Sequence, residues 1–537
     1  MACIVRQRVG KYTYLYESVS YRDEKKRPRS HRTRIGKVDP ETGMDVYDDW
    51  YIDRLNSEGK PLPPGAQESA VNVRPTGTGP AEELLSTIRS YGNVRVLEEI
   101  GRQEGVIPLL ADHFPDSWQK IFGLAAFVVC TNEAMMYYDD WAEEQYLPEE
   151  ATMSSQRISE FFDSICEEER NAFYRDWMKL LPSVEYLALD ITSISSYSEL
   201  MGNVEWGYNR DGEKLAQVNL CMLFGEESEL PCFQITYSGS AADVLTLLTT
   251  VDELRALLPG KRFRLVMDKG FYSEPNVQTL LDQKPAIEFI VAAPFSADFA
   301  RKQVDLVRSQ IDGISHAVVT AGETVRGIHK VRSWGPKREK LHVYVFHNPE
   351  TALRARNNLY RFVKELEAEA HAHPKSRKWR KAFDRYLIIR KSRMSPSGVT
   401  VTIREDVIEE ELKYSGWLVL VSTLIFTPAQ ALEIYRRKDV VEKSFDRLKR
   451  GFCMRRLRVH SDERAENKLF VGFIAQILIS SLSRRMREAN LFRQYSISKA
   501  LHVLSRIKVG HVGERMYRRP LTAEQRQLTE NLGVSEL

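Results

Sequence analysis

The sequence has few cysteines and no long hydrophobic run. None of the six cysteines stands in a CxxC pair, which argues against the common zinc and redox motifs and favours free thiols in a reducing compartment. The longest apolar stretch, Leu469–Leu482, is shorter than the roughly 20 residues of a membrane span and predicts a buried helix. The first residues lack the apolar core of a signal peptide. We therefore expect a cytoplasmic protein with no membrane contact.

Net charge is also small, at +3 for 537 residues, so no acidic or basic excess covers the whole chain. Basic residues are instead concentrated locally, and local charge is what binds a polyanion. The length exceeds that of one ordinary domain, and an apolar content of 43% is ample for several cores. Several domains with one or more basic surfaces are therefore expected.

The first part of the chain predicts a β-rich basic unit over residues 1–54. Apolar and polar residues alternate on both sides of Gly10-Lys11, which is typical of a hairpin. The segment Arg22–Lys37 is rich in Lys and Arg, and two interpretations stay open for it: a solvated loop or an arm that contacts DNA. Residues 55–80 are rich in Pro, Gly, Ser and Asn and predict a linker.

Residues 81–182 show apolar positions at helical spacing and predict an all-helical domain, which we expect to bind DNA. Residues 183–293 then change to short apolar strands. Three strands come in succession, followed by helix, strand, helix, strand, which predicts an α/β fold with a mixed sheet and helices on both faces. This region is the first part of the expected catalytic core.

The strand pattern of the core stops at Ala293 and resumes at Trp417. We therefore interpret residues 294–415 as a mainly β insertion that interrupts the sheet. Residues 416–490 are the expected second part of the core, and residues 491–537 a C-terminal helical tail.

Two aspartates stand at predicted strands of the core. Asp190 lies within the apolar run YLALDIT, where an unpaired carboxylate would be costly, and Asp268 ends the run FRLVMD. Taken singly, each is typical of a turn or cap residue. Together, at the first and fourth strands, they favour a site for divalent metal. Gly270 follows closely and would allow a near approach or a positive φ.

The third acid, Glu442, lies in a strongly basic stretch that predicts a single helix. Tyr435, Lys438, Glu442 and Lys449 are separated by three, four and seven residues and would share one face of that helix. Cations outnumber acids from Arg436 to Arg458, which suits phosphate contacts better than a solvated amphipathic helix.

These features resemble the DDE transposases of bacterial insertion sequences, in the insertion-sequence-four superfamily. Members carry a signature of Tyr, two residues, Arg, three residues, Glu, six residues, Lys. The chain matches it at Tyr435, Glu442 and Lys449, and Lys438 stands at the Arg position. The motif DKGFYS resembles the family motif around the second acid. At the Arg position of the signature, Lys438 would give a point charge instead of the bidentate fork of an arginine.

The resemblance implies a ribonuclease H-like core in which Asp190, Asp268 and Glu442 are catalytic and bind two Mg²⁺ ions, with Mn²⁺ as a substitute. It implies metal-dependent DNA cleavage at element ends, followed by strand transfer. The partners would be double-stranded DNA of element ends and target, bound by a homodimer associated with the nucleoid. The expected DNA-binding residues are Tyr435, Arg437, Lys438, Lys449 and Arg450.

Two other functions stay open on the sequence. One is a metal-dependent nuclease or resolvase, although the insertion and the N-terminal regions exceed what a nuclease needs. The other is a catalytically silent DNA-binding protein derived from a transposase, against which the intact acid trio argues.

Overall fold

The computed structural model describes residues 2–9, 12–22, 28–39, 43–61, 63, 88–148, 153–182, 185–320, 322–392, 398–512 and 515–534. The chain divides into two units: Met1–Thr87 with His511–Arg515, and Ile88–Gly510 with Met516–Leu537. The expected linker, residues 55–80, begins inside helix α1 (Asp49–Ser57), and nearly all of its remainder beyond residue 61 lies outside the described residues.

The first unit is built on an antiparallel sheet of order β1-β2-β3-β4. Its strands are β1 (Ala2–Val9), β2 (Tyr12–Arg22), β3 (Pro28–Val38) and β4 (Asp45–Tyr47). Val9 pairs with Tyr12, so the hairpin forms where the alternating sequence predicts it. Strand β3 takes up residues 28–37 of the basic segment, so a loop is the wrong interpretation there. Residues 23–27 of that segment lie outside the described part of the chain.

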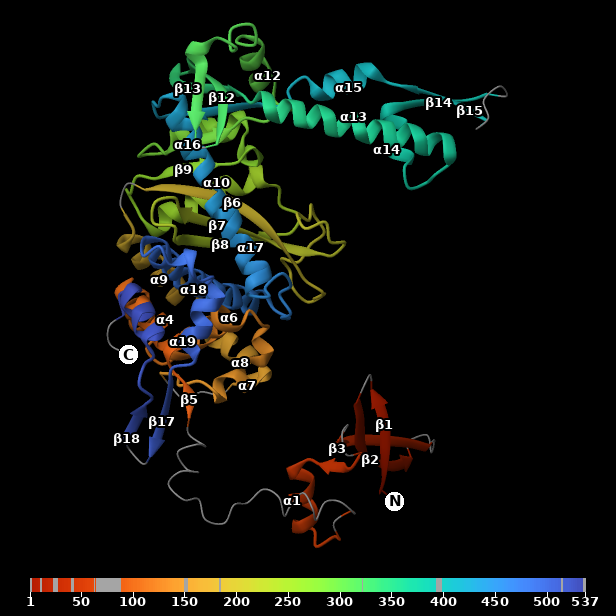
Figure 1. Ribbon diagram of the computed structural model, residues 1–537, viewed down its shortest axis with the longest axis vertical. Helices are drawn as coiled ribbons and strands as arrows, with labels where there is room; N and C mark the ends of the chain where they lie inside the picture. Colours follow the sequence, from red (N-terminus) through yellow and green to blue (C-terminus); the bar gives the residue numbers. More distant parts are fainter. Residues whose placement is uncertain are drawn as a thin grey trace. The chain divides into compact units, whose positions relative to one another are not determined.

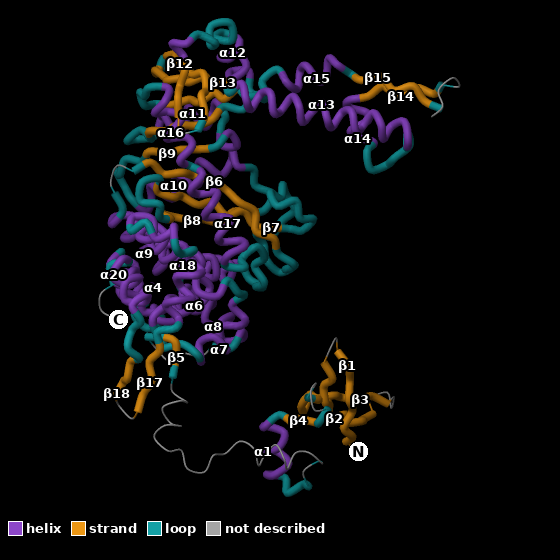
Figure 2. Tube along the Cα trace, viewed as in Figure 1, coloured by secondary structure: helices purple, strands orange, loops and turns teal. Residues whose placement is uncertain are grey.

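The second unit contains a nine-stranded sheet of order β11-β12-β13-β16-β10-β9-β6-β7-β8 (Figures 1 and 2). Strands β6, β7 and β8 form an antiparallel meander, and β9 and β10 continue the sheet in parallel beside β6. This confirms the mixed sheet that the sequence predicts. The strands that were expected are β6 (Tyr186–Ser195), β7 (Gln217–Gly225), β8 (Pro231–Ser238), β9 (Arg264–Met267), β10 (Glu288–Ala292) and β16 (Trp417–Ser422).

Helices cover both faces of this sheet. Along β9, Leu265 faces the main core, whereas its neighbour Val266 faces a smaller cluster that includes Leu432 of α16 (Pro428–Arg437). The main core takes in residues from the crossover helices α10 (Asp243–Leu257) and α11 (Glu274–Asp282). Successive residues of a strand point to opposite faces, so apolar residues at both kinds of position bury the sheet on both sides.

The predicted insertion needs a correction, because part of it belongs to the sheet. Strands β11 (Ala317–Thr320), β12 (Glu323–Trp334) and β13 (Glu339–His347) are three of the nine strands of this sheet, and β13 pairs directly with β16. The run Leu341–Phe346 is buried throughout, which requires a central position in a sheet. The sheet therefore does not stop at Ala293.

Residues 349–392 and 398–412 lie outside the sheet and form a mostly helical arm with its own small core (Figure 1). Its elements are α13 (Pro349–Ala372), α14 (Arg380–Tyr386), β14 (Leu387–Lys391), β15 (Val399–Ile403) and α15 (Glu405–Leu412). The description of this region as mainly β is accordingly wrong.

The expected helical region shares one hydrophobic core with the sheet and belongs to the same unit. Its helices are α4 (Gly92–Gln103), α5 (Val106–His113), α6 (Trp118–Thr131), α7 (Tyr138–Glu143), α8 (Ser155–Ser164) and α9 (Glu167–Leu180). They pack with α18 (Asp462–Glu488), α19 (Ile497–Ser505) and α20 (Ala523–Asn531). The remaining described elements include α12 (Asp298–Asp305), β5 (Arg89–Ser90), β17 (Lys508–Val512) and β18 (Arg515–Arg518).

Helix α18 is the central helix of this core. It is long and apolar enough to cross a membrane by composition, but 89% of its most apolar window is buried inside the protein. Among the described residues, the other candidate is the pair Trp118–Thr131 and Met135–Glu143, which is bent by 104°. The stretch Leu469–Leu482 is buried, as the sequence predicts.

The basic stretch around Glu442 does not form the single helix that its spacing predicts. Helix α16 ends at Arg437, α17 (Asp439–Asp446) follows after Lys438, and a π-helical turn covers Arg447–Gly451. A π turn shifts the register of everything after it. Lys449 therefore leaves the face of the other three signature residues, whereas Lys438 still bonds to Glu442 and lies over the ring of Tyr435.

Candidate active site

The first two acids are neighbours in the sheet. Strands β6 and β9 run parallel, with Leu189 paired to Met267, so Asp190 and Asp268 occupy the next position on each side. Neighbouring strands lie roughly 4.8 Å apart, and side chains at paired positions project to the same face. Two carboxylates separated by more than seventy residues in sequence are thus brought side by side by strand register.

Asp190 carries the more strongly perturbed of these carboxyls. Burial raises its pKa to about 6, and the nearby charge of Asp268 acts in the same direction. The N–H of Ile191 donates a 2.8 Å hydrogen bond to Asp190 Oδ1, and the charges of Lys438 and Arg210 also lower the pKa. The carboxylate form is therefore costly here unless more positive charge is supplied.

The end of α16 brings two further groups to these acids. Tyr435 donates a 2.9 Å hydrogen bond to Asp268 Oδ1. Burial raises the Tyr435 pKa, and the negative charges of Asp268, Glu442 and Asp190 raise it further. The phenol therefore stays protonated and acts as a donor. Tyr435 bonds directly to Asp268, and it lies close enough to Asp190 and Glu442 for their charges to raise its pKa.

Lys438 links the third acid to the pair. Its ammonium donates a 2.8 Å hydrogen bond to Glu442 Oε1, and its side chain is only 9% exposed. Burial alone would lower the Lys438 pKa, but the Glu442 hydrogen bond and the charges of Asp268, Glu442 and Asp190 outweigh it and raise the pKa. A charged lysine thus lies among the three acids.

The other expected DNA-binding residues do not reach the acids. Lys449 makes a 2.8 Å ion pair with Asp211, and burial lowers its pKa. Arg450 pairs with Asp446 at 2.9 Å on the surface, and Arg437 pairs with Glu433 at 2.6 Å. The π turn after Asp446 accounts for the direction of Lys449, because it rotates the chain away from the face of Glu442.

Two residues near the acids have no signal in the sequence. Arg210, in the loop after β6, lowers the pKa of Asp190 and forms a short ion pair with Asp243. Asp243 in turn packs on Gly270, where an added Cβ would lie 2.8 Å from its Oδ2. The near approach expected at Gly270 is thus made by the side chain of Asp243. No sequence motif connects Arg210 to Asp190, which lies twenty residues earlier.

The chemistry of the donor set suits a hard divalent cation. Adjacent carboxylates, one of them desolvated, are compensated best by a cation with oxygen preference. Within the described residues, no three His, Cys, Asp or Glu side chains stand close enough together to hold an ion. The Lys438–Glu442 ion pair holds the third carboxylate on the ammonium.

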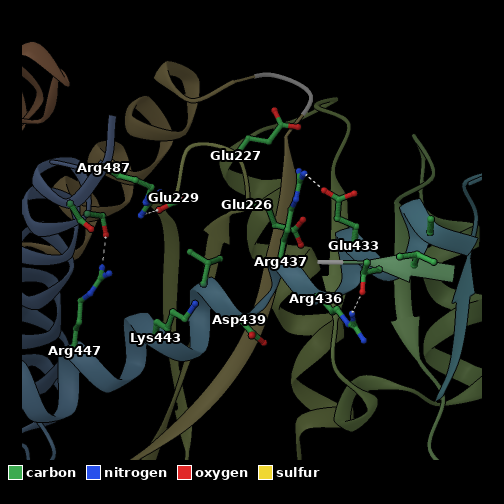
Figure 3. A pocket seen from close by; sticks show the side chains of 16 residues that line it. Glu226, Glu227, Glu229, Glu433, Arg436, Arg437, Asp439, Lys443, Arg447 and Arg487 are labelled. Carbon is green, nitrogen blue, oxygen red and sulfur yellow. Dashed lines mark hydrogen bonds and ion pairs between the residues drawn. The ribbon is translucent and has the colours of Figure 1, made fainter. Parts of the chain in front are cut away.

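A cavity of about 1160 Å³ lies beside α17, and none of the three acids lines it (Figure 3). Its charged lining comprises Glu226, Glu227, Glu229, Glu433, Asp439, Arg436, Arg437, Lys443, Arg447 and Arg487. Neither carboxylate oxygen of Glu226 has a hydrogen-bond partner among the described residues. Burial raises the pKa of Glu226 to about 8, the charges of Glu185 and Glu227 add to this, and Arg437 opposes it.

A mixed sheet sets two acids at adjacent strands, and a third acid lies on a basic helix. Residues 185–478 match the family described as the transposase DDE domain. This match covers more than half of the 537 residues, so the chain belongs to the DDE transposase family.

A solved structure is also similar to this chain. It is the piggyBac transposase in a synaptic complex with hairpin DNA, with 11% identity and a TM-score of 0.35 over 82% of this chain and 74% of that chain. No curated protein matches the sequence.

Proposed function

We propose that this transposase cuts DNA at the ends of an insertion sequence and joins those ends to target DNA. The observation that carries the proposal is the parallel register of β6 and β9, which sets Asp190 beside Asp268. Tyr435 and Lys438 connect this pair to Glu442. Membership of the insertion-sequence-four superfamily is part of the proposal and rests on the spacing of Tyr435, Lys438, Glu442 and Lys449.

The core of the sheet is, in this proposal, ribonuclease H-like. The order β8-β7-β6-β9-β10, with a meander extended by two parallel strands, supports it. Asp190 then lies on the first strand, Asp268 after the fourth and Glu442 on a late helix, which is the placement that the resemblance implies.

Asp190, Asp268 and Glu442 are the proposed catalytic residues and metal ligands. Two Mg²⁺ ions, or Mn²⁺ in their place, would activate a water or 3′-hydroxyl nucleophile and stabilise the leaving oxygen. Tyr435 orients the Asp268 carboxylate through its hydrogen bond. Lys438 offsets the negative charge of the three acids while Glu442 is held on its ammonium.

Double-stranded DNA, as element end and as target, is the proposed partner, and a homodimer would hold two ends together in the nucleoid. Arg437, Lys438, Lys449 and Arg450 are proposed phosphate contacts, with Tyr435 at the cleaved end. The basic strand β3 and the helices α4–α9 are proposed to recognise the element end. Arg32→Ala with Arg34→Ala should weaken end binding in a gel-shift assay, and unchanged binding would remove β3 from the interface.

One experiment separates the three candidate functions. The purified chain is incubated with Mg²⁺, a DNA carrying both element ends with their flanking inverted repeats, and a target plasmid. End cleavage with joined products supports the transposase, and cleavage without joining supports a nuclease or resolvase. End binding without cleavage indicates a silent derivative.

A further inference from the structure

The loop between β6 and β7 exposes an unusual set of large apolar side chains. Trp206 is 70% exposed and Tyr208 is 83% exposed, and Tyr197 and Leu200 of the same loop are 65% and 79% exposed. A single exposed aromatic residue on a surface is ordinary, whereas several within a dozen residues mark a surface that binds something.

The backbone that carries these rings is held in place. Glu205 and Gln217 exchange two backbone hydrogen bonds of 3.0 Å. The carbonyl of Tyr208 accepts bonds from Ser193 Oγ at 3.2 Å and from Gln217 Nε2 at 3.0 Å. Trp206 and Tyr208 therefore project from a fixed support, and we call residues 205–208 the aromatic ledge.

Gly207, between the two rings, explains how the ledge is seated. A Cβ at Gly207 would lie 1.9 Å from the carbonyl oxygen of Gly239, so the two backbones touch and no larger residue fits. This close packing fixes the backbone on which the two exposed rings are mounted. Rings on a fixed backbone lose less conformational entropy when a ligand stacks on them.

The ledge lies close to the acids. Arg210, two residues after Tyr208, lowers the pKa of Asp190 and forms an ion pair with Asp243. Asp211 next to it pairs with Lys449. The carbonyl of Tyr208 is itself bonded to Ser193 of β6, the strand that carries Asp190.

The basic segment 455–458 lies along the end of β6, and its arginines contact the loop that carries the ledge. The N–H of Leu457 donates to the carbonyl of Ser195 at 3.1 Å, which fixes this segment along the end of β6. Arg456 lies over the ring of Tyr197 at 5.0 Å, and Arg455 and Arg456 reach Glu213. Lys214 and Arg458 are exposed as well. Aromatic rings interleaved with cations are typical of surfaces that bind single-stranded nucleic acid.

We propose that the aromatic ledge stacks on unpaired bases of the DNA strand whose phosphate enters the active site. The occupant is a single strand because bases inside a duplex already cover each other's faces, whereas an unpaired base offers its face to Trp206 or Tyr208. This proposal rests on the proposed function for its location, and on the ledge itself for its chemistry.

The test measures binding of the full chain to a fluorescent oligothymidine of about 20 nucleotides, longer than the ~4–16 nucleotides that one binding fold covers. A blunt mixed-sequence duplex is the second probe. Trp206→Ala and Tyr208→Ala should each weaken oligothymidine binding by about 5- to 150-fold, since stacking contributes about 1–3 kcal/mol per base. Duplex binding should stay unchanged, and Trp206→Phe should retain most single-strand affinity.

Leu200→Ala is the matched control, because Leu200 is as exposed in the same loop but cannot stack. Equal loss in this variant, equal loss on the duplex probe, or no loss in Trp206→Ala would overturn the proposal. A DNA-free dimer of the parent that Trp206→Ala converts to a monomer would also overturn it, since a second copy would then be the occupant.

The design separates this proposal from the proposed function. Asp268→Asn should bind oligothymidine like the parent, because Asp268 contacts no ledge residue among its described partners. A chain that never cleaves DNA but binds the single strand through Trp206 keeps the ledge and rejects the transposase chemistry. If cleavage depends on Asp268 but oligothymidine binding does not change in Trp206→Ala, the ledge proposal is rejected and the proposed transposase function is kept.

Discussion

The phenol of Tyr435 donates a 2.9 Å hydrogen bond to Asp268, across a sequence separation of 167 residues. The bond joins the C-terminal turn of α16 to the position that follows β9. A carboxylate that receives one directed hydrogen bond is fixed in rotation and has its other oxygen left for a ligand. Tyr435 is therefore a positioning residue for Asp268.

Tyr435→Phe should raise the Mg²⁺ concentration that cleavage needs, while the protein stays folded. The substitution deletes only the hydroxyl that orients Asp268, and loss of such a supporting partner typically costs about 10–100-fold in metal affinity or activity. We expect the Mg²⁺ concentration for half-maximal cleavage to rise by that factor, while binding of end DNA, which has several other proposed phosphate contacts, changes by less.

The control for Tyr435→Phe is Tyr360→Phe, which removes a hydroxyl from an exposed tyrosine of the helical arm. A magnesium titration that superimposes on that of the parent would show that Tyr435 does not position a metal ligand. An equal shift in Tyr360→Phe would show a nonspecific effect.

The sequence predicts the sheet well because strand periodicity and succession are local signals. The runs that contain Asp190 and Asp268 form β6 and β9 in a mixed sheet, as expected, and register then brings the two acids together. Their separation in sequence does not prevent this, because the strand order makes β6 and β9 parallel neighbours whose carboxyl ends lie at the same edge of the sheet.

The failures of prediction come from interactions that are not local. The spacing of Tyr435, Glu442 and Lys449 is helical, but the π turn after Asp446 directs Lys449 to Asp211. The strand Glu339–His347 reads as part of an insertion because its partner β16 comes some seventy residues later. Arg210 could not be foreseen, because only the folded loop brings it to Asp190.

Asp268→Asn should abolish cleavage while leaving DNA binding intact. The amide is isosteric and still accepts the Tyr435 hydrogen bond, but it lacks the charge that binds a divalent cation. Cleavage assays with Mg²⁺ and gel shifts on the same end DNA measure the two effects separately. Asp282→Asn, an exposed carboxylate paired with Lys337, is the control and should cleave normally. Near-parental cleavage by Asp268→Asn would remove this residue from the catalytic site.

Lys438→Ala should shift the acid limb of the pH–rate profile to higher pH. Burial already raises the Asp190 pKa to about 6, and the Lys438 charge opposes that rise. Without this charge the Asp190 pKa increases, so a higher pH is needed for the carboxylate form. End binding should also fall by roughly the 1–3 kcal/mol of a hydrogen bond to a charged group.

Lys438→Arg is the companion variant, because it keeps the charge and should keep a profile close to that of the parent. A Lys438→Ala profile with an unshifted acid limb would mean that Lys438 does not control the protonation of Asp190. Activity lost equally in the arginine variant would point to the shape of the lysine and not to its charge.

Glu226→Gln should stabilise the protein at alkaline pH and not at acid pH. Burial raises the Glu226 pKa from an ordinary 4.5 to about 8, so the folded state holds a proton that the unfolded state has released between those values. Because the folded state binds more protons, the free energy of unfolding of the parent falls as pH rises through this window and levels off above it. Glutamine carries no proton to lose, so its advantage should grow from near zero at about pH 4.5 to roughly 2–4 kcal/mol at about pH 8.

Urea unfolding at several values between pH 4.5 and pH 8.5 measures this difference. Asp439→Asn is the matched control, since Asp439 lines the same cavity, is exposed and is not among the charges that act on Glu226. Because the carboxylate oxygens of Glu226 lack hydrogen-bond partners among the described residues, the amide replaces an uncompensated charge with a neutral group of the same shape. Parallel stability curves for parent and Glu226→Gln across the whole range would show that Glu226 is ionised in the folded protein, and that a cation in the cavity, such as Arg437, compensates it fully.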